Sequence, residues 1–110
     1  MTEQTYFILA SLLGGPLHGY AIVSEAAELS GGSVRLSAGT LYGALERLAR
    51  DEMVKDDGEE TVAGRRRRYY RLTDGGAGAL VAEVERMRSA AAAVERRMTR
   101  PIATRRPRPA

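Results

Sequence analysis

The chain of 110 residues carries 17 lysine and arginine residues against 14 acidic ones, with one histidine and no cysteine. The lack of cysteine excludes a disulfide framework and a thiolate metal site, and a single histidine leaves metal catalysis little to work with. The length allows one small core, and an apolar content of mostly alanine, leucine and valine favours closely packed helices.

The first residues of the sequence do not predict a signal peptide. Residues 1–13 lack the basic start, long apolar run and small-residue cleavage site of a signal peptide. No apolar run in the sequence reaches membrane-spanning length. We therefore expect a soluble, cytoplasmic protein.

The positive charge is concentrated in patches. Acidic residues gather between Glu46 and Glu60, whereas Arg65–Arg68, Arg71 and the C-terminal tail hold most of the basic excess. Sixteen of the seventeen cationic residues are arginine, whose guanidinium forms bidentate hydrogen bonds with phosphate oxygens and guanine edges that lysine cannot form. The patches point to an anionic partner, although genome base composition can produce the same bias.

Two helices are expected first. A dense apolar run from Thr5 to Leu13 predicts a short helix buried on more than one side, which the glycines and proline at 14–16 end. A second helix is expected from Leu17 to Leu29, and the polar, glycine-containing stretch 30–33 closes it. The core face assigned to this second helix carries Tyr20, Val23 and Ala27.

The stretch from Ser37 to Val54 predicts a third helix with Ser37 as its N-cap. Its core stripe at helical spacing consists of Leu41, Leu45 and Leu48. Its opposite face consists of Thr40, Gly43, Arg47 and Arg50. This slim polar and cationic face suits a helix that reads DNA. On this segment alone, an ordinary amphipathic helix explains the pattern equally well.

A basic hairpin is expected next. Met53–Asp56 and Arg66–Leu72 predict two strands, and the polar residues 57–64 between them predict a long tip. Alternation directs Tyr70 and Leu72 inward. The order of these elements describes a winged helix-turn-helix domain over residues 1–73, in a fold that is mainly α with a small β-hairpin.

A last helix is expected from Thr73 or Asp74 to about Met98, as a dimerisation helix of residues 74–98. Its apolar positions alternate spacings of three and four residues, which is the pattern of a coiled-coil seam. A helix of this span is about 37 Å long, more than the small domain needs. We therefore expect a homodimer, although the first turns of the seam can cover the protein's own domain. The expected interface residues are Phe7, Leu80, Val84, Met87, Ala91, Val94 and Met98.

Residues 99–110 combine three prolines and four arginines without apolar periodicity, which predicts a disordered basic tail. The tail either contacts phosphates without sequence preference or has no role.

Four short motifs occur in a recognisable order. They are Leu17-His18-Gly19-Tyr20, Gly39-Thr40-Leu41-Tyr42 with Leu45 and Leu48 after it, Arg68-Tyr69-Tyr70-Arg71-Leu72-Thr73, and the junction that ends at Gly76. Over about residues 5 to 98, this arrangement resembles the PadR family of bacterial transcriptional regulators. The chain has Gly43 where the family often has proline, and Glu52 where it often has glycine. Glu52 removes the easy left-handed C-cap of the third helix.

The resemblance implies a homodimeric repressor whose third helices enter successive major grooves of a near-palindromic operator in double-stranded DNA. The candidate DNA-binding residues are Ser37, Thr40, Tyr42, Arg47, Arg65, Arg66, Arg67 and His18. His18 can instead be a local hydrogen-bonding residue. Arg68 and Arg71 are expected to pair with acids such as Glu46, and Tyr20 is expected to be structural.

The resemblance also implies that a small apolar or aromatic effector releases the DNA. Helix phase suggests an effector pocket lined by Tyr6, Phe7, Leu80, Val84 and Met87. No cofactor and no metal are expected.

Two other classes of function compete with this interpretation. The acidic residues beside the expected wing would suit a winged-helix domain that binds another protein without specific DNA binding, but the arginines that follow favour DNA. An enzyme is not expected, because no nucleophile has an evident base and no glycine motif has the context of a dinucleotide loop.

Overall fold

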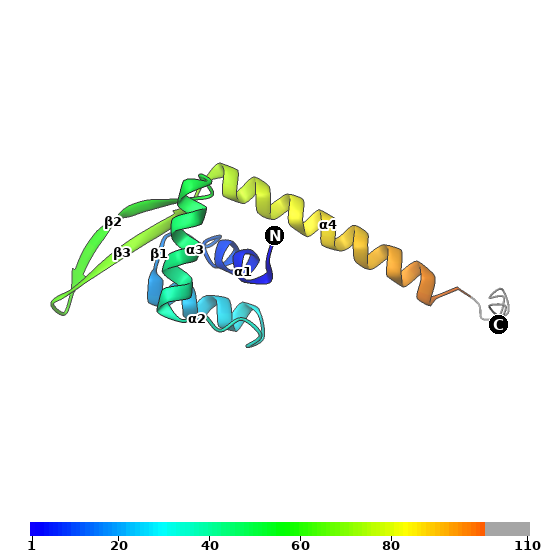
Figure 1. Ribbon diagram of the computed structural model, residues 1–110, viewed down its shortest axis with the longest axis horizontal. Coiled ribbons are helices and arrows are strands. Elements are labelled where there is room, and N and C mark those ends of the chain that lie inside the picture. The colour runs from blue at the N-terminus through cyan, green and yellow to red at the C-terminus, as the bar shows by residue number, and fades with distance from the viewer. Residues whose placement is uncertain (101–110) are drawn as a thin grey trace.

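The computed structural model describes residues 1–100. The elements in chain order are α1 (Glu3–Ser11), β1 (Leu17–His18), α2 (Gly19–Leu29), α3 (Ala38–Arg50), β2 (Val54–Val62), β3 (Arg65–Leu72) and α4 (Asp74–Met98). The strands form one antiparallel sheet in the order β1-β3-β2. The first three helices cluster at the base of this sheet, while the β2–β3 wing and α4 project from the cluster on opposite sides (Figure 1). This architecture confirms the predicted winged helix-turn-helix.

The core lies between the first three helices, β2 and the start of α4. Its largest fully buried side chains are Ile8, Leu9, Ile22, Leu41 and Leu45. Leu48 completes the stripe of α3 at 5% exposure, so the predicted leucine face is confirmed. Each side chain of this kind contributes about 1.5–3 kcal/mol when fully buried. The core therefore fixes which face of α3 remains outside.

The predicted core face of the second helix is wrong at Tyr20, while Val23 packs against the core as expected. Leu17 and His18 form β1, which pairs with Tyr70 and Tyr69 of β3, and α2 begins at Gly19. The buried face of α2 carries Ile22 and Ala26, whereas Tyr20 is 81% exposed. The physical reason is that β1 fixes the start of α2, and this start turns Ile22 toward α1 and α3.

The wing is longer than expected, and the long tip predicted for residues 57–64 is wrong. The two strands continue to a two-residue turn, in which Ala63 and Gly64 have φ values of 51° and 80°. Two successive positive φ values are the geometry of a type I′ hairpin turn. Tyr70 and Leu72 pack against the core, as the alternation predicted.

Helix α4 has the expected range and begins with Thr73 as N-cap, whose side chain accepts from the amide of Gly76. Gly76 lies so close to the carbonyl of Met53 that a side chain there would collide with the backbone. Only the first part of α4 packs on the domain, where Leu80 is 5% exposed. Beyond Met87 the apolar stripe continues without cover, with Val94 53% and Met98 72% exposed.

None of the helices in residues 1–100 combines the length and the apolarity that crossing a membrane requires. Most of the expected basic tail, residues 101–110, lies outside the described part of the chain.

Candidate nucleic-acid interface

The exposed start of α3 presents two hydroxyl groups. Ser37 caps the helix, because its Oγ accepts from the amide of Thr40 at 3.2 Å. The Ser37 hydroxyl donates to the Thr40 Oγ1 at 3.0 Å, and both residues are exposed. The Thr40 O–H can therefore still donate to an outside acceptor, and the positive end of the helix dipole lies at the same place.

The rest of the exposed α3 face is cationic. Arg50 forms an exposed ion pair with Glu46 at 3.6 Å within the helix. Arg47 is exposed, and no ion pair is recorded for it within residues 1–100. Since its guanidinium is not held by a carboxylate, Arg47 is the residue of this helix best placed to meet a phosphate.

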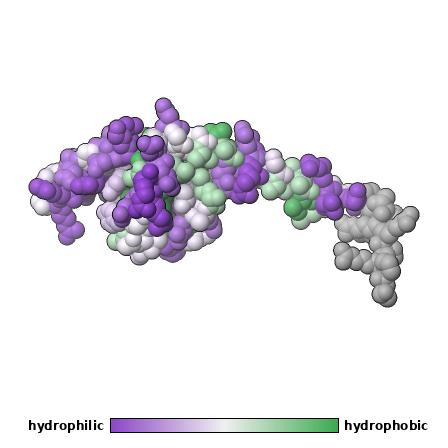
Figure 2. Space-filling view, turned by 45° about the horizontal axis from the view of Figure 1, so that its top comes forward, coloured by the Kyte–Doolittle hydropathy of each residue, from purple (hydrophilic) through white to green (hydrophobic). Residues whose placement is uncertain are grey.

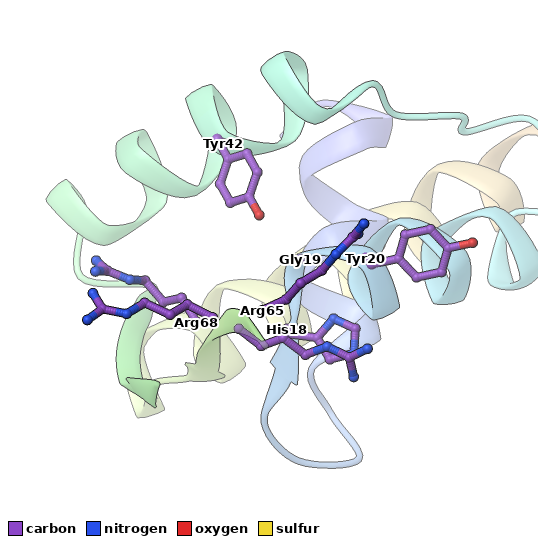
Figure 3. A pocket seen from close by; sticks show the side chains of 8 residues that line it. His18, Gly19, Tyr20, Tyr42, Arg65 and Arg68 are labelled. Atoms are coloured by element: carbon purple, nitrogen blue, oxygen red, sulfur yellow. The ribbon is translucent and has the colours of Figure 1, made fainter. Parts of the chain in front are cut away.

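A cleft of about 430 Å³ lies between the helices and the wing. Its lining residues are His18, Gly19, Tyr20, Tyr42, Arg65, Arg66, Arg67 and Arg68. Figure 3 shows Tyr42 reaching from α3 toward the cleft, with arginines of β3 opposite. The cleft thus places a phenol of α3 beside four consecutive arginine residues of β3.

Tyr42 and Gly19 fit closely together across this cleft. A Cβ atom on Gly19 would lie 2.7 Å from the Tyr42 hydroxyl oxygen, so only glycine leaves the phenol in this position. Tyr42 itself is 51% exposed, which makes it accessible from the cleft.

His18 has both a structural contact and a free edge. Its Nδ1 accepts from the amide of Ala21 at 3.4 Å and caps α2, and its ring meets Tyr69 edge to face at 5.7 Å between centroids. When the ring is neutral, this bond places its proton on Nε2. The local hydrogen-bonding role is therefore present, and Nε2 remains for an acceptor in the cleft.

Within the wing, the arginines of β3 differ in their partners. Arg68 contacts Glu59 at 2.8 Å and Asp56 at 3.1 Å. These carboxylates raise the pKa of Arg68, chiefly through the hydrogen bond that Arg68 donates to Glu59. Arg71 contacts Asp57 at 3.6 Å. The expected pairing of Arg68 and Arg71 with acidic residues is confirmed, but the partners belong to β2 and do not include Glu46. The extended β2 places its own acids directly opposite β3.

The structure brings together most of the predicted DNA-binding residues. His18, Tyr42 and the arginines at 65–67 line one cleft, while Ser37, Thr40 and Arg47 lie on the exposed face of the adjoining α3. Figure 2 shows hydrophilic residues over the wing. Sequence reasoning missed Tyr20 as a surface residue. The apolar pair Ile22 and Ala26, four residues apart, was the signal that would have placed it outside.

A second groove of about 400 Å³ lies between α1 and α4. Its lining includes Tyr6, Phe7 and Met87 from the predicted effector pocket, with Glu83 and Arg86 beside them. Glu83 is 8% exposed and accepts two hydrogen bonds from Arg86, at 2.8 and 2.6 Å, which lower the pKa of this carboxyl. Two of the predicted lining residues are not part of the groove.

Those two residues are Leu80 and Val84. Leu80 belongs to the core of its own domain, so its assignment to the pocket and to a dimer surface is wrong. Val84 is half-buried but is not among the residues that line the groove. Around Leu80, α4 is more deeply buried in its own domain than the spacing of its apolar residues predicted.

Solved structures share this fold. A PadR family transcription regulator from hypervirulent Clostridium difficile is 25% identical, with a TM-score of 0.71 that covers 88% of this chain and 99% of that one. Bacillus subtilis PadR, solved in complex with operator DNA, is 26% identical, with a TM-score of 0.64 over 73% of this chain and 45% of its own.

Sequence comparisons agree with the structural ones. An uncharacterized 37.1 kDa protein in transposon TN4556 of Streptomyces fradiae is 38% identical over 85 residues, which are 77% of this chain. This chain spans only 23% of the length of that relative. Residues 8–82 match the transcriptional regulator PadR-like family, which consists of regulators and not of enzymes. Because this match covers more than half of the sequence, the chain belongs to the PadR-like family of transcriptional regulators.

Proposed function

We propose that the protein is a sequence-specific DNA-binding regulator that acts as a homodimer in the cytoplasm. The observation that carries the proposal is the exposed polar start of α3 beside a cleft lined by four consecutive arginines. Phosphate contacts by such residues provide affinity, while side chains that reach base edges provide specificity. The operator DNA bound to Bacillus subtilis PadR supports the same use of this fold.

In this proposal α3 enters the major groove. Thr40 donates to a base edge or a phosphate, Ser37 orients the Thr40 hydroxyl through its own hydrogen bond, and Arg47 contacts the backbone. Arg65, Arg66 and Arg67 carry the wing along the backbone or into the adjacent minor groove, where a narrow groove concentrates negative potential. Tyr42 and His18 complete the contact from inside the cleft.

The dimer is proposed to form through the outer face of α4 together with Phe7 of α1, with residues 1–73 as the reading domain. The apolar residues on this surface are Phe7, Val84, Met87, Ala91, Val94 and Met98. Pairing these stripes removes apolar surface from water and gives the projecting helix a partner. Two copies of α3 then read half-sites of a near-palindromic operator about one helical turn apart.

The regulator is proposed to be a repressor that a small apolar or aromatic effector releases. The groove beside Tyr6, Phe7 and Met87 lies where α1 meets α4, so a ligand there would change how two subunits are oriented. The double variant F7A/M87A should lose ligand-induced release of DNA in a binding assay. Unchanged release in this variant would contradict the location of the effector.

A winged-helix protein-interaction module is the second candidate, because four acidic residues lie along β2. Binding to a labelled fragment from upstream of the protein's own gene, compared with a scrambled duplex at several salt concentrations, separates the two candidates. A regulator should prefer its operator by more than about a hundredfold and show a steep salt dependence. If the protein binds both duplexes equally weakly and salt does not change either affinity, the proposal of DNA binding is rejected.

A further inference from the structure

The wing places carboxylates directly opposite its arginines. In the antiparallel register, Glu59 pairs with Arg68 and Glu60 pairs with Arg67. Acidic β2 and basic β3 therefore form one exposed surface of opposite charges, in a segment proposed to contact polyanionic DNA. Any phosphate that approaches must compete with these carboxylates for the guanidinium groups.

Glu59 is the centre of this network. Its Oε1 accepts from the Arg68 Nη2 at 2.8 Å, and its Oε2 lies 4.0 Å from the Arg66 Nη1. One carboxylate thus binds Arg68 through a hydrogen bond and lies at the limit of ion-pair distance from Arg66, whose side chain is 83% exposed. Both arginines lie on the same face of β3. This arrangement resembles the one that a bound phosphate would make with the same arginines.

A β-bulge adds a second carboxylate to the network. The register shifts between Asp56 and Glu59, and Gly58 has a φ of 94°. The amide of Gly58 donates to the Asp56 Oδ1 at 2.9 Å, which fixes the carboxylate so that its Oδ2 lies 3.1 Å from the Arg68 Nη1. Arg68 is therefore held from two sides, even though its side chain remains 53% exposed.

The other arginines at the tip are not held in this way. No ion pair is recorded for Arg65 or Arg67 within residues 1–100. Glu60, the strand partner of Arg67, instead accepts from the Tyr69 hydroxyl at 2.9 Å. The wing consequently has two kinds of arginine, one paired with carboxylates of β2 and one without a carboxylate partner within residues 1–100. Arg67, of the second kind, contacts the Tyr69 hydroxyl.

We propose that Glu59, with Asp56, is an internal substitute for phosphate that holds Arg68, and more loosely Arg66, and weakens binding of the wing to DNA of any sequence. The proposal rests on the proposed function of DNA binding. Non-specific affinity comes from cations that neutralise phosphates and release counterions, so an arginine already paired contributes less to it. Lowering this term raises the preference for the operator, because the contacts of α3 then decide where the protein binds.

The test measures affinity of the full-length protein for a scrambled duplex across a range of salt concentrations. The variant E59Q should bind this duplex about tenfold more tightly than the original protein, with a steeper salt slope. E60Q is the matched control, since it removes the same charge from the next residue without releasing an ion-paired arginine. Its affinity should rise by no more than about threefold, through the loss of repulsion alone.

A second pair of variants tests the route through arginine. D56N should change affinity in the same direction as E59Q, but less, because Glu59 still holds Arg68. The double variant E59Q/R68A should lose most of the gain of E59Q. Circular dichroism and the midpoint of thermal unfolding verify that the variants are folded.

Equal gains in E59Q and E60Q would overturn the proposal, because net charge alone would then explain both. No gain in E59Q would also overturn it. The affinity of the original protein for its operator is measured first, at several salt concentrations. If this affinity depends on salt, a negative result with E59Q rejects only the role of the wing carboxylates and not DNA binding itself. Absence of any salt-dependent DNA binding would overturn both proposals.

Discussion

At the scale of single residues, Glu52 shows how a glycine position tolerates a side chain. Its φ is 59°, in the left-handed region that normally favours glycine. The amides of Glu52 and Met53 donate to the carbonyls of Ala49 and Leu48, at 3.1 and 2.9 Å, which is the Schellman pattern at the end of α3. The cap therefore forms with glutamate, and the Thr73 hydroxyl donates to the Glu52 carbonyl as additional support.

The variant E52G should be more stable than the original protein, by about 0.5–1 kcal/mol in the free energy of unfolding. Glycine removes the steric cost of the left-handed backbone, although it gains more freedom in the unfolded chain. Urea unfolding measures the change. E52A retains a Cβ atom in the same conformation and should show no gain, so equal stabilisation by both substitutions would contradict the strain at this position.

At the scale of elements, the turn of the wing also holds a non-glycine residue in the left-handed backbone region, which costs conformational energy. Ala63 has a φ of 51°, a value at which asparagine is favoured because its side chain bonds to the local backbone. A63N should raise the free energy of unfolding by about 0.5 kcal/mol, as thermal unfolding can measure. G64A places a side chain at a φ of 80° and should act in the opposite direction. Destabilisation by A63N would contradict the type I′ assignment.

The elements that the sequence predicted well have strong internal periodicity. Leucines at helical spacing predicted the buried face of α3, and apolar residues at alternating spacings predicted the range of α4. The wing could not be predicted to its full length, because residues 55–61 of β2 are exposed and show no inside-outside alternation. Strand β1 has only two residues, and its partners in β3 lie about fifty residues away in sequence, so no local pattern marks it.

The sequence predicted most of the residues that make up the candidate site, but not the ion pairs that these residues form with one another. The arginines at 65–67 and the hydroxyl groups of Ser37 and Thr40 were identifiable because residue type and element order indicated their role. The ion pairs of Arg68 with Asp56 and Glu59 depend on the register and the bulge of the wing, which the sequence does not display. Tyr20 was misplaced because the phase of α2 depends on where β1 ends.

At the scale of the whole molecule, the far half of α4 is the part with the most exposed apolar side chains, Val94 and Met98 among them. This part of the helix extends away from the domain (Figure 1), and Figure 2 shows apolar surface along it. In the first half of α4, the same stripe covers the protein's own core through Leu80. The first half of α4 thus packs on its own domain, and in the proposed dimer the second half packs on the partner subunit.

The variant V94E should shift the protein from dimer to monomer and weaken the proposed operator binding by at least about tenfold, because a charge would be buried in an apolar contact. Analytical ultracentrifugation measures the mass, and a duplex titration measures the affinity. A93E places the same charge at an exposed position about 100° around the helix from Val94, outside the apolar stripe, and should leave the dimer intact. A monomeric original protein would contradict the proposed interface.

The measurement that tests the central claim most directly is the salt dependence of operator affinity for the double variant R65A/R67A beside the original protein. These two arginines lie in the cleft next to α3 and have no recorded ion pair within residues 1–100. A dimer should lose up to four phosphate contacts, so the slope of log affinity against log salt should fall by about two to four. An unchanged slope and affinity would show that DNA does not bind at this face.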